Sequence, residues 1–185
     1  MLRRPLLIAP LLAALPPVHA DDTALAAAIR AGGVAVLLRH AITEPGIGDP
    51  PGMRVDDCTS QRNLSAEGRE QSRRFGAWFA RHSLAPAAVR SSAWCRCLDT
   101  AQLAFGRVER WAPLNSFFGD RGREPAQTAA ARSALAAIPA GRFEVWVTHQ
   151  VNITALSGEG IAMGEAIVAA APAGQLRVVG RLAVR

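Results

Sequence analysis

Residues 34–41 read Val34-Ala35-Val36-Leu37-Leu38-Arg39-His40-Ala41, an apolar run that ends on an arginine and a histidine. A continuous apolar run of this length predicts a strand that is buried on both faces of a sheet. The pattern recurs in Phe143–Thr148, a second apolar strand that is followed by His149. Each of these strands therefore ends on an imidazole.

Working outward from these strands, the chain alternates between short strands and helical stretches. Helices are expected at 21–30, 94–105, 127–137 and 153–156. One further helix is expected to start at Ser65 and to carry an apolar stripe that ends near Phe79. Strands are expected at 34–38, 88–91, 108–114, 143–148, 167–170 and 176–182. This alternation predicts a three-layer α/β/α sandwich with a mainly parallel central sheet. In such sheets ligands bind beyond the carboxyl ends of the strands, which is where His40, Ser91 and His149 fall.

The first 20 residues have the pattern of a secretory signal peptide. A basic start (Met1–Arg4) precedes an apolar stretch (Pro5–Leu15), and Val18-His19-Ala20 ends in small residues. A short membrane anchor is the alternative, but the apolar stretch is shorter than the roughly 20 residues that span a bilayer. We expect cleavage after Ala20, a single domain over residues 21–185, no stable membrane span, and a periplasmic or secreted location.

The charge of the chain favours small anionic partners. All 21 positive side chains are arginines, and removing two of them with the signal peptide lowers the formal net charge from +6 to +4. No basic run is interleaved with aromatic residues, so nucleic acid is not an expected partner. Arginine makes bidentate contacts to phosphate, which favours a small phosphorylated substrate.

The three cysteines are Cys58, Cys95 and Cys97. In an exported protein this number predicts one disulfide and one leftover thiol. Cys95 and Cys97 lie too close together at a helix start to bond to each other, so Cys58 is expected to pair with one of them. Zinc needs more ligands at closer spacing, and no metal site is expected.

The residue types at the strand ends are those of a phosphoryl-transfer site. A neutral His40 imidazole can attack phosphorus and form a phosphohistidine that water then hydrolyses. Arg39 and Arg96 supply cations for the phosphoryl oxygens, and Arg96 follows a Ser-Ser pair near a helix start, where anions are favoured. His149 is either a second imidazole on the phosphoryl group or a buried structural histidine. Taken alone, Arg96 would sooner be read as a solvated helix residue.

From about Gly33 to Gly158 the chain resembles the histidine phosphatase superfamily, the phosphoglycerate-mutase-like group. The resemblance implies that His40 is phosphorylated, that Arg39, Arg96 and His149 hold the phosphate, and that Thr43 adds a hydrogen bond. Two small departures are Ala93, where the family has proline, and Cys97, where it has alanine. The matching motifs are Leu38-Arg39-His40-Ala41, Asn63–Arg69, Ser91–Ala101 and Val147-Thr148-His149.

Three segments, 58–65, 94–97 and 149–153, look like a bacterial exported subgroup. That subgroup includes phosphatases that act on the heptose phosphate of the lipopolysaccharide core. The resemblance therefore implies a sugar phosphate of the cell envelope as substrate.

The proton donor of the family has no match in this chain. Many relatives carry a glutamate where this chain reads Asn115–Phe118, and another branch has an aspartate where Gln150 stands. Asp120 is the first candidate for a general acid, followed by Glu124 and Glu44.

The sequence thus predicts an exported phosphomonoester hydrolase that uses a phosphohistidine on His40, without a metal or other cofactor. The missing acid motivates two alternatives. One is a protein phosphohistidine phosphatase, whose substrate has a better leaving group. The other is a protein that only binds phosphorylated envelope components.

Overall fold

A computed structural model describes residues 20–184. The predicted signal peptide, residues 1–20, lies outside the described residues except for Ala20, where helix α1 (Ala20–Ala31) begins. Within residues 20–184, no helix combines the length and the apolar character that crossing a membrane requires.

One six-stranded sheet forms the centre of the molecule, in the order β3-β2-β4-β1-β5-β6. The first four strands in this order are parallel, whereas β5 and β6 run antiparallel along one edge. The mainly parallel sheet predicted from the sequence is confirmed. The strands are β1 (Val34–Arg39), β2 (Ala88–Ser91), β3 (Glu109–Arg110), β4 (Phe143–Thr148), β5 (Glu165–Ala170) and β6 (Arg177–Ala183).

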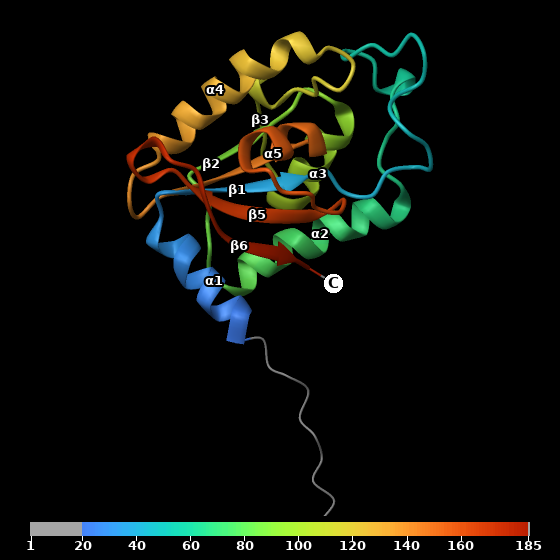
Figure 1. The fold of residues 1–185 in the computed structure, drawn as a ribbon. Coiled ribbons are helices and arrows are strands. Elements are labelled where there is room, and N and C mark those ends of the chain that lie inside the picture. The colour runs from blue at the N-terminus through green and yellow to red at the C-terminus, as the bar shows by residue number, and fades with distance from the viewer. Residues whose placement is uncertain (1–19, 185) are drawn as a thin grey trace, which may run out of the picture.

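Helices cover both faces of the sheet, which gives the three predicted layers (Figure 1). Successive residues of β1 point to opposite faces. Val36 and Leu38 pack with α1, α2 (Ala66–Arg81) and α3 (Cys95–Phe105), whereas Ala35 and Leu37 pack with α4 (Glu124–Ala136) and α5 (Gln150–Ser157). Burial on both faces explains why β1 and β4 read as continuous apolar runs. Four short 3-10 helices complete the fold: η1 (Cys58–Ser60), η2 (Ala112–Leu114), η3 (Arg121–Arg123) and η4 (Pro172–Gly174).

Two predicted elements differ from the structure. The strand predicted at 108–114 is only Glu109–Arg110, because the chain turns into η2 with Pro113 in its first turn, and proline has no N–H for a sheet ladder. The short helix predicted at 153–156 is α5, which begins at Gln150 directly after the end of β4. The second difference matters, because it puts His149 at the N-cap position of this helix, although its side chain makes no capping hydrogen bond.

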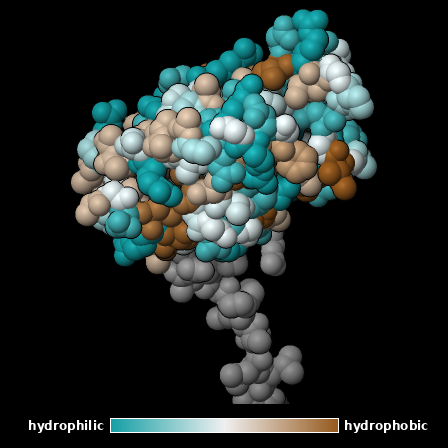
Figure 2. Space-filling model, turned by 45° about the horizontal axis from the view of Figure 1, so that its top comes forward, coloured by the Kyte–Doolittle hydropathy of each residue, from teal (hydrophilic) through white to brown (hydrophobic). Residues whose placement is uncertain are grey.

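A long connection, the β1–α2 loop (residues 40–65), lies beyond the end of the sheet and is the teal segment of Figure 1. Its two ends meet: Thr43 pairs with Leu64, and Ser65 N donates to Ile42 O at 3.1 Å. Ser65 also caps α2 by accepting a hydrogen bond from Gly68 N, as its sequence context predicts. On the face seen in Figure 2, hydrophobic residues form small groups among hydrophilic ones.

Close packing of α2 against α3 depends on Gly76, because a Cβ at this position would overlap the backbone carbonyl of Ala104. We expect Gly76→Ala to lower the free energy of unfolding by about 1–3 kcal/mol, the usual cost of overpacking. Alanine is the better helix former by about 1 kcal/mol, so an unchanged or raised stability would contradict this packing. Gly119→Ala, where the added Cβ meets nothing within 4 Å, is the control in urea denaturation.

Candidate active site

The carboxyl ends of β1, β2 and β4 meet at one place. Pairing continues past the strand ends, because His40 N donates to Thr148 O and Ser92 N donates to Val147 O, each at 3.0 Å. As a result the rings of His40 and His149 lie with their centroids 5.4 Å apart. The structure therefore brings together the two histidines and the Ser-Ser segment that the sequence placed at strand ends.

His40 has a defined protonation state. Its Nδ1 lies 2.9 Å from the carbonyl oxygen of Ala41, which can only accept a hydrogen bond, so Nδ1 carries the proton and Nε2 keeps a lone pair. Burial lowers the pKa of His40 to about 3, and the charges of Arg96, Arg39 and Arg62 act in the same direction, against the Ala41 bond. His40 is therefore a neutral imidazole at neutral pH, with an available lone pair on Nε2.

His149 is also a buried, neutral imidazole. Burial lowers its pKa well below the usual value, and His40 and the nearby arginines lower it further. Its Nε2 lies 2.9 Å from the hydroxyl of Ser92 and 3.5 Å from the thiol of Cys97. These contacts fix the orientation of the ring next to His40.

Arg39 extends from the end of β1 toward α5. Its Nη1 donates to Ile161 O at 2.8 Å and to Gln150 Oε1 at 3.4 Å. Its Nε is buried without a hydrogen-bond partner among residues 20–184. Gln150, which stands where one branch of the family has an acid, thus helps to hold Arg39.

Arg96 lies in the first turn of α3, and only 4% of it is exposed. Both of its terminal nitrogens bind the carboxylate of Asp49, at 2.5 and 3.1 Å. Its carbonyl accepts from the hydroxyl of Thr100 at 2.7 Å, and that hydroxyl also accepts from Ala41 N at 3.0 Å. Thr100 therefore connects the backbone of Arg96 to the residue that follows His40.

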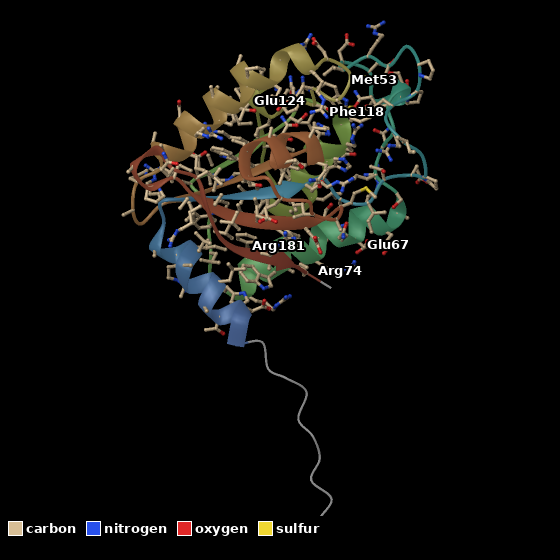
Figure 3. All side chains as sticks on the ribbon, viewed as in Figure 1. Met53, Glu67, Arg74, Phe118, Glu124 and Arg181 are labelled. Carbon is tan, nitrogen blue, oxygen red and sulfur yellow. A yellow bond between two sulfur atoms is a disulfide. The ribbon has the colours of Figure 1, made fainter. Side chains whose placement is uncertain are left out.

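The other predicted residues lie in different settings. Thr43 is buried, with its hydroxyl 3.7 Å from the sulfur of Met163. The side chain of Asp120 is 57% exposed, and its carboxylate binds Arg123 at 2.8 Å and caps η3. Glu124, which is labelled in Figure 3, binds Arg121 at 3.0 Å on the surface. None of these contacts joins Asp120 or Glu124 to the two histidines, so their assignment as the acid stays a prediction.

Sequence reasoning missed three residues of this site, Asp49, Arg62 and Asn115. Asp49 lies in the β1–α2 loop, where no periodicity or motif marks it, and Arg62 lies in the same loop, within the segment 58–65, without a role assigned to it. Asn115 stands where a glutamate was sought; its side-chain oxygen accepts from Ala93 N at 2.8 Å. An amide here holds the segment after β2 in place.

The cysteines form one disulfide, Cys58–Cys95, and leave Cys97 free and buried. This confirms the predicted count and decides between the two possible partners of Cys58. Burial raises the pKa of Cys97 to about 12, so its sulfur stays a thiol beside His149. The disulfide joins η1 to the start of α3, next to Arg96.

Elsewhere in the described part of the chain, fewer functional side chains gather in one place than at the strand ends. No group of three or more His, Cys, Asp and Glu side chains within residues 20–184 is arranged to hold a metal ion. Two open hollows of about 450 and 430 Å³ lie at the opposite end of the strands, along Phe143 and Ala88. Converging polar groups, and not the volume of a hollow, mark the strand ends as the candidate site.

No family model and no curated protein sequence matches the chain, but solved structures do. SixA from Agrobacterium tumefaciens is 20% identical, over 81% of this chain and 97% of that one, with a TM-score of 0.57. The protein histidine phosphatase SixA complexed with tungstate is 14% identical, over 81% of this chain and 96% of that one, with a TM-score of 0.56. A mycobacterial glucosyl-3-phosphoglycerate phosphatase is 16% identical, over 80% of this chain and 98% of that one, with a TM-score of 0.58. The chain therefore has the phosphoglycerate-mutase-like α/β fold that histidine phosphatases share.

The neutral state of His40 has a consequence for stability. In the unfolded chain His40 takes up a proton near pH 6.5, whereas in the folded protein its pKa is about 3. The unfolded state thus binds more protons between these values, and stability falls as the pH falls from 6.5 toward 3. We expect His40→Gln to reduce the slope of unfolding free energy against pH between 6.5 and 5 by up to about 1.4 kcal/mol per pH unit. Urea denaturation at several pH values measures it; parallel curves for the two proteins would show that His40 protonates freely when folded.

The disulfide closes a segment of 37 residues that contains part of the site. A loop of that length stabilises a protein by about 3–4 kcal/mol through the entropy of the unfolded chain. We expect the double variant Cys58→Ser, Cys95→Ser to melt at a lower temperature than the wild type. A reducing agent should lower the melting temperature of the wild type and leave the double variant unchanged; an equal response of both proteins would argue against the bond.

Proposed function

We propose that the protein is a phosphomonoester hydrolase of the histidine phosphatase superfamily that works through a phosphohistidine on His40. The observation that carries the proposal is the state of His40. It is neutral, its Nδ1 proton is held by Ala41 O, and its free Nε2 lies in the field of Arg96, Arg39 and Arg62. The shared fold and the four sequence motifs support the same assignment.

In the proposed reaction, Arg39 and Arg96 bind the oxygens of the phosphoryl group, which carry the negative charge of the transition state. The lone pair of His40 Nε2 attacks phosphorus as the ester P–O bond breaks, and the leaving oxygen takes a proton. Water then attacks the phosphohistidine, breaks the P–N bond, and releases inorganic phosphate and neutral His40. Covalent catalysis divides one displacement into two easier steps.

Protonation of the leaving group is the step for which residues 20–184 offer no acid hydrogen-bonded to either histidine, with Asp120 as the candidate from the sequence. General acid catalysis contributes about 10²–10⁴-fold, so an ester with a poor leaving group should react slowly. The amide of Asn115, in place of the family's glutamate, favours a second candidate function, a protein phosphohistidine phosphatase. One structure of this fold carries the name protein histidine phosphatase. The two functions use the same His40 chemistry and differ in the leaving group.

The location and the natural substrate belong to the same proposal. The signal-peptide pattern and the disulfide support an exported, periplasmic or secreted protein. The subgroup motifs support a sugar phosphate of the cell envelope, such as that of the lipopolysaccharide core. A phosphatase screen that compares sugar phosphates, lipopolysaccharide fragments and a phosphohistidine protein side by side distinguishes these substrates.

The central test removes the nucleophile. His40→Asn should lower the hydrolysis of an aryl phosphate by at least about 10³-fold, as removal of a covalent nucleophile does, and should abolish acid-labile phosphate trapped on the protein. His82→Asn, at the C-terminal cap of α2, is the matched control. A chelator should leave wild-type activity unchanged.

Full activity in His40→Asn would overturn the proposed mechanism. Saturable binding of phosphosugars without turnover of any aryl phosphate would instead support a protein that only binds phosphorylated envelope components.

A further inference from the structure

The carboxylate of Asp49 accepts four hydrogen bonds. Its Oδ1 accepts from Arg96 Nη1 at 2.5 Å and from Arg62 N at 3.1 Å. Its Oδ2 accepts from Arg96 Nη2 at 3.1 Å and from the indole N–H of Trp94 at 3.0 Å. Only 12% of its side chain is exposed. The β1–α2 loop thus places one carboxylate in the candidate site, against the two terminal nitrogens of the Arg96 guanidinium.

This carboxylate is not the missing general acid. Burial by itself raises the pKa of Asp49, but the hydrogen bonds and charge of Arg96, with those of Arg62 N and Trp94, outweigh burial and hold the pKa below its usual value. Asp49 is therefore ionised at neutral pH and has no proton to give. Its role must come from what it does to Arg96.

The way Asp49 binds leaves one edge of Arg96 free. A guanidinium is planar and has five N–H donors, and a bidentate carboxylate at its end uses two of them. The Nε–H lies on a side edge of the plane; it is buried and has no partner among residues 20–184. Arg39 Nε and Arg62 Nε, which belong to two other arginines of the candidate site, are in the same condition. Buried N–H groups are normally bonded, so three free ones at the candidate site suit an oxyanion ligand.

We propose that Asp49 is a positioning residue, which locks the plane of Arg96 so that its free edge faces the phosphoryl group bound at His40. The inference rests on the proposed function, because it assigns the bound group. A buried arginine without its counter-ion is costly and adopts other rotamers. Asp49 supplies that counter-ion from the β1–α2 loop, which Cys58–Cys95 fastens to the start of α3.

The opposite role would be a plug, in which Asp49 occupies the place of the substrate phosphate and must leave before binding. The two roles predict changes of opposite sign. Loss of a positioning carboxylate weakens the binding of a tetrahedral oxyanion, whereas loss of a plug strengthens it.

The experiment compares the wild type with Asp49→Asn, which keeps the shape and removes the charge, and with Asp49→Glu, which keeps the charge. Asp56→Ala, an exposed carboxylate of the same loop, is the matched control. The measurements are kcat and KM for an aryl phosphate, the Kd for tungstate by calorimetry, and the melting temperature. We expect Asp49→Asn to lower kcat/KM and tungstate affinity by about 10- to 100-fold, the range for a lost hydrogen bond to a charged group. Asp49→Glu should restore part of both, and Asp56→Ala should match the wild type.

Tighter tungstate binding by Asp49→Asn would overturn the proposal in favour of a plug, and wild-type values would overturn it outright. A lowered melting temperature with unchanged tungstate affinity would also overturn it, because the role would then be structural only. If the wild type turns over no phosphate but Asp49→Asn still weakens tungstate binding, the proposed function fails and the positioning role stands. If the wild type neither turns over substrate nor binds tungstate, both fail.

Discussion

The parallel pairing of β1 with β4 is the constraint on which the site depends. Their register sets Arg39 opposite Thr148, and the hydrogen bond from His40 N to Thr148 O carries the pairing one residue further. Two apolar strands buried on both faces have little freedom to slip, because a shift of one residue would turn every side chain to the other layer. The distance between the two imidazoles is thus set by the centre of the hydrophobic core.

The core also sets the electrostatics of the site. Both histidines are buried next to arginines, and each of these conditions disfavours a proton on the ring. Neutral imidazoles keep their lone pairs, whereas guanidinium groups stay charged under the same conditions. In the proposed mechanism burial therefore separates the roles, with His40 forming the bond to phosphorus and the arginines supplying positive charge. Asp49 partly offsets the positive charge, and a phosphate dianion would offset the rest.

The β1–α2 loop adds what the sheet cannot supply. The ends of β1 and β4 and the residues directly after them provide Arg39, His40 and His149, whereas Asp49 and Arg62 come from further along the loop, and the disulfide ties it to α3. A loop that is fastened at several points can carry a charged residue into a buried site at a fixed position. Because one fold hosts many functions, substrate specificity is expected to depend on such loop segments and not on the sheet.

The sequence by itself determined the layers, the mainly parallel sheet and the strand ends that carry His40, Ser91 and His149, because apolar periodicity and local motifs are properties of neighbouring residues. Only the tertiary structure decided the contacts between distant residues. It placed Asp49 on Arg96, 47 positions later in the chain, and chose Cys95 over Cys97 as the partner of Cys58. It also shortened the strand before Pro113. Such pairs leave no local pattern, since the partner of a charge or a thiol is fixed by how the chain folds back and not by the residues beside it.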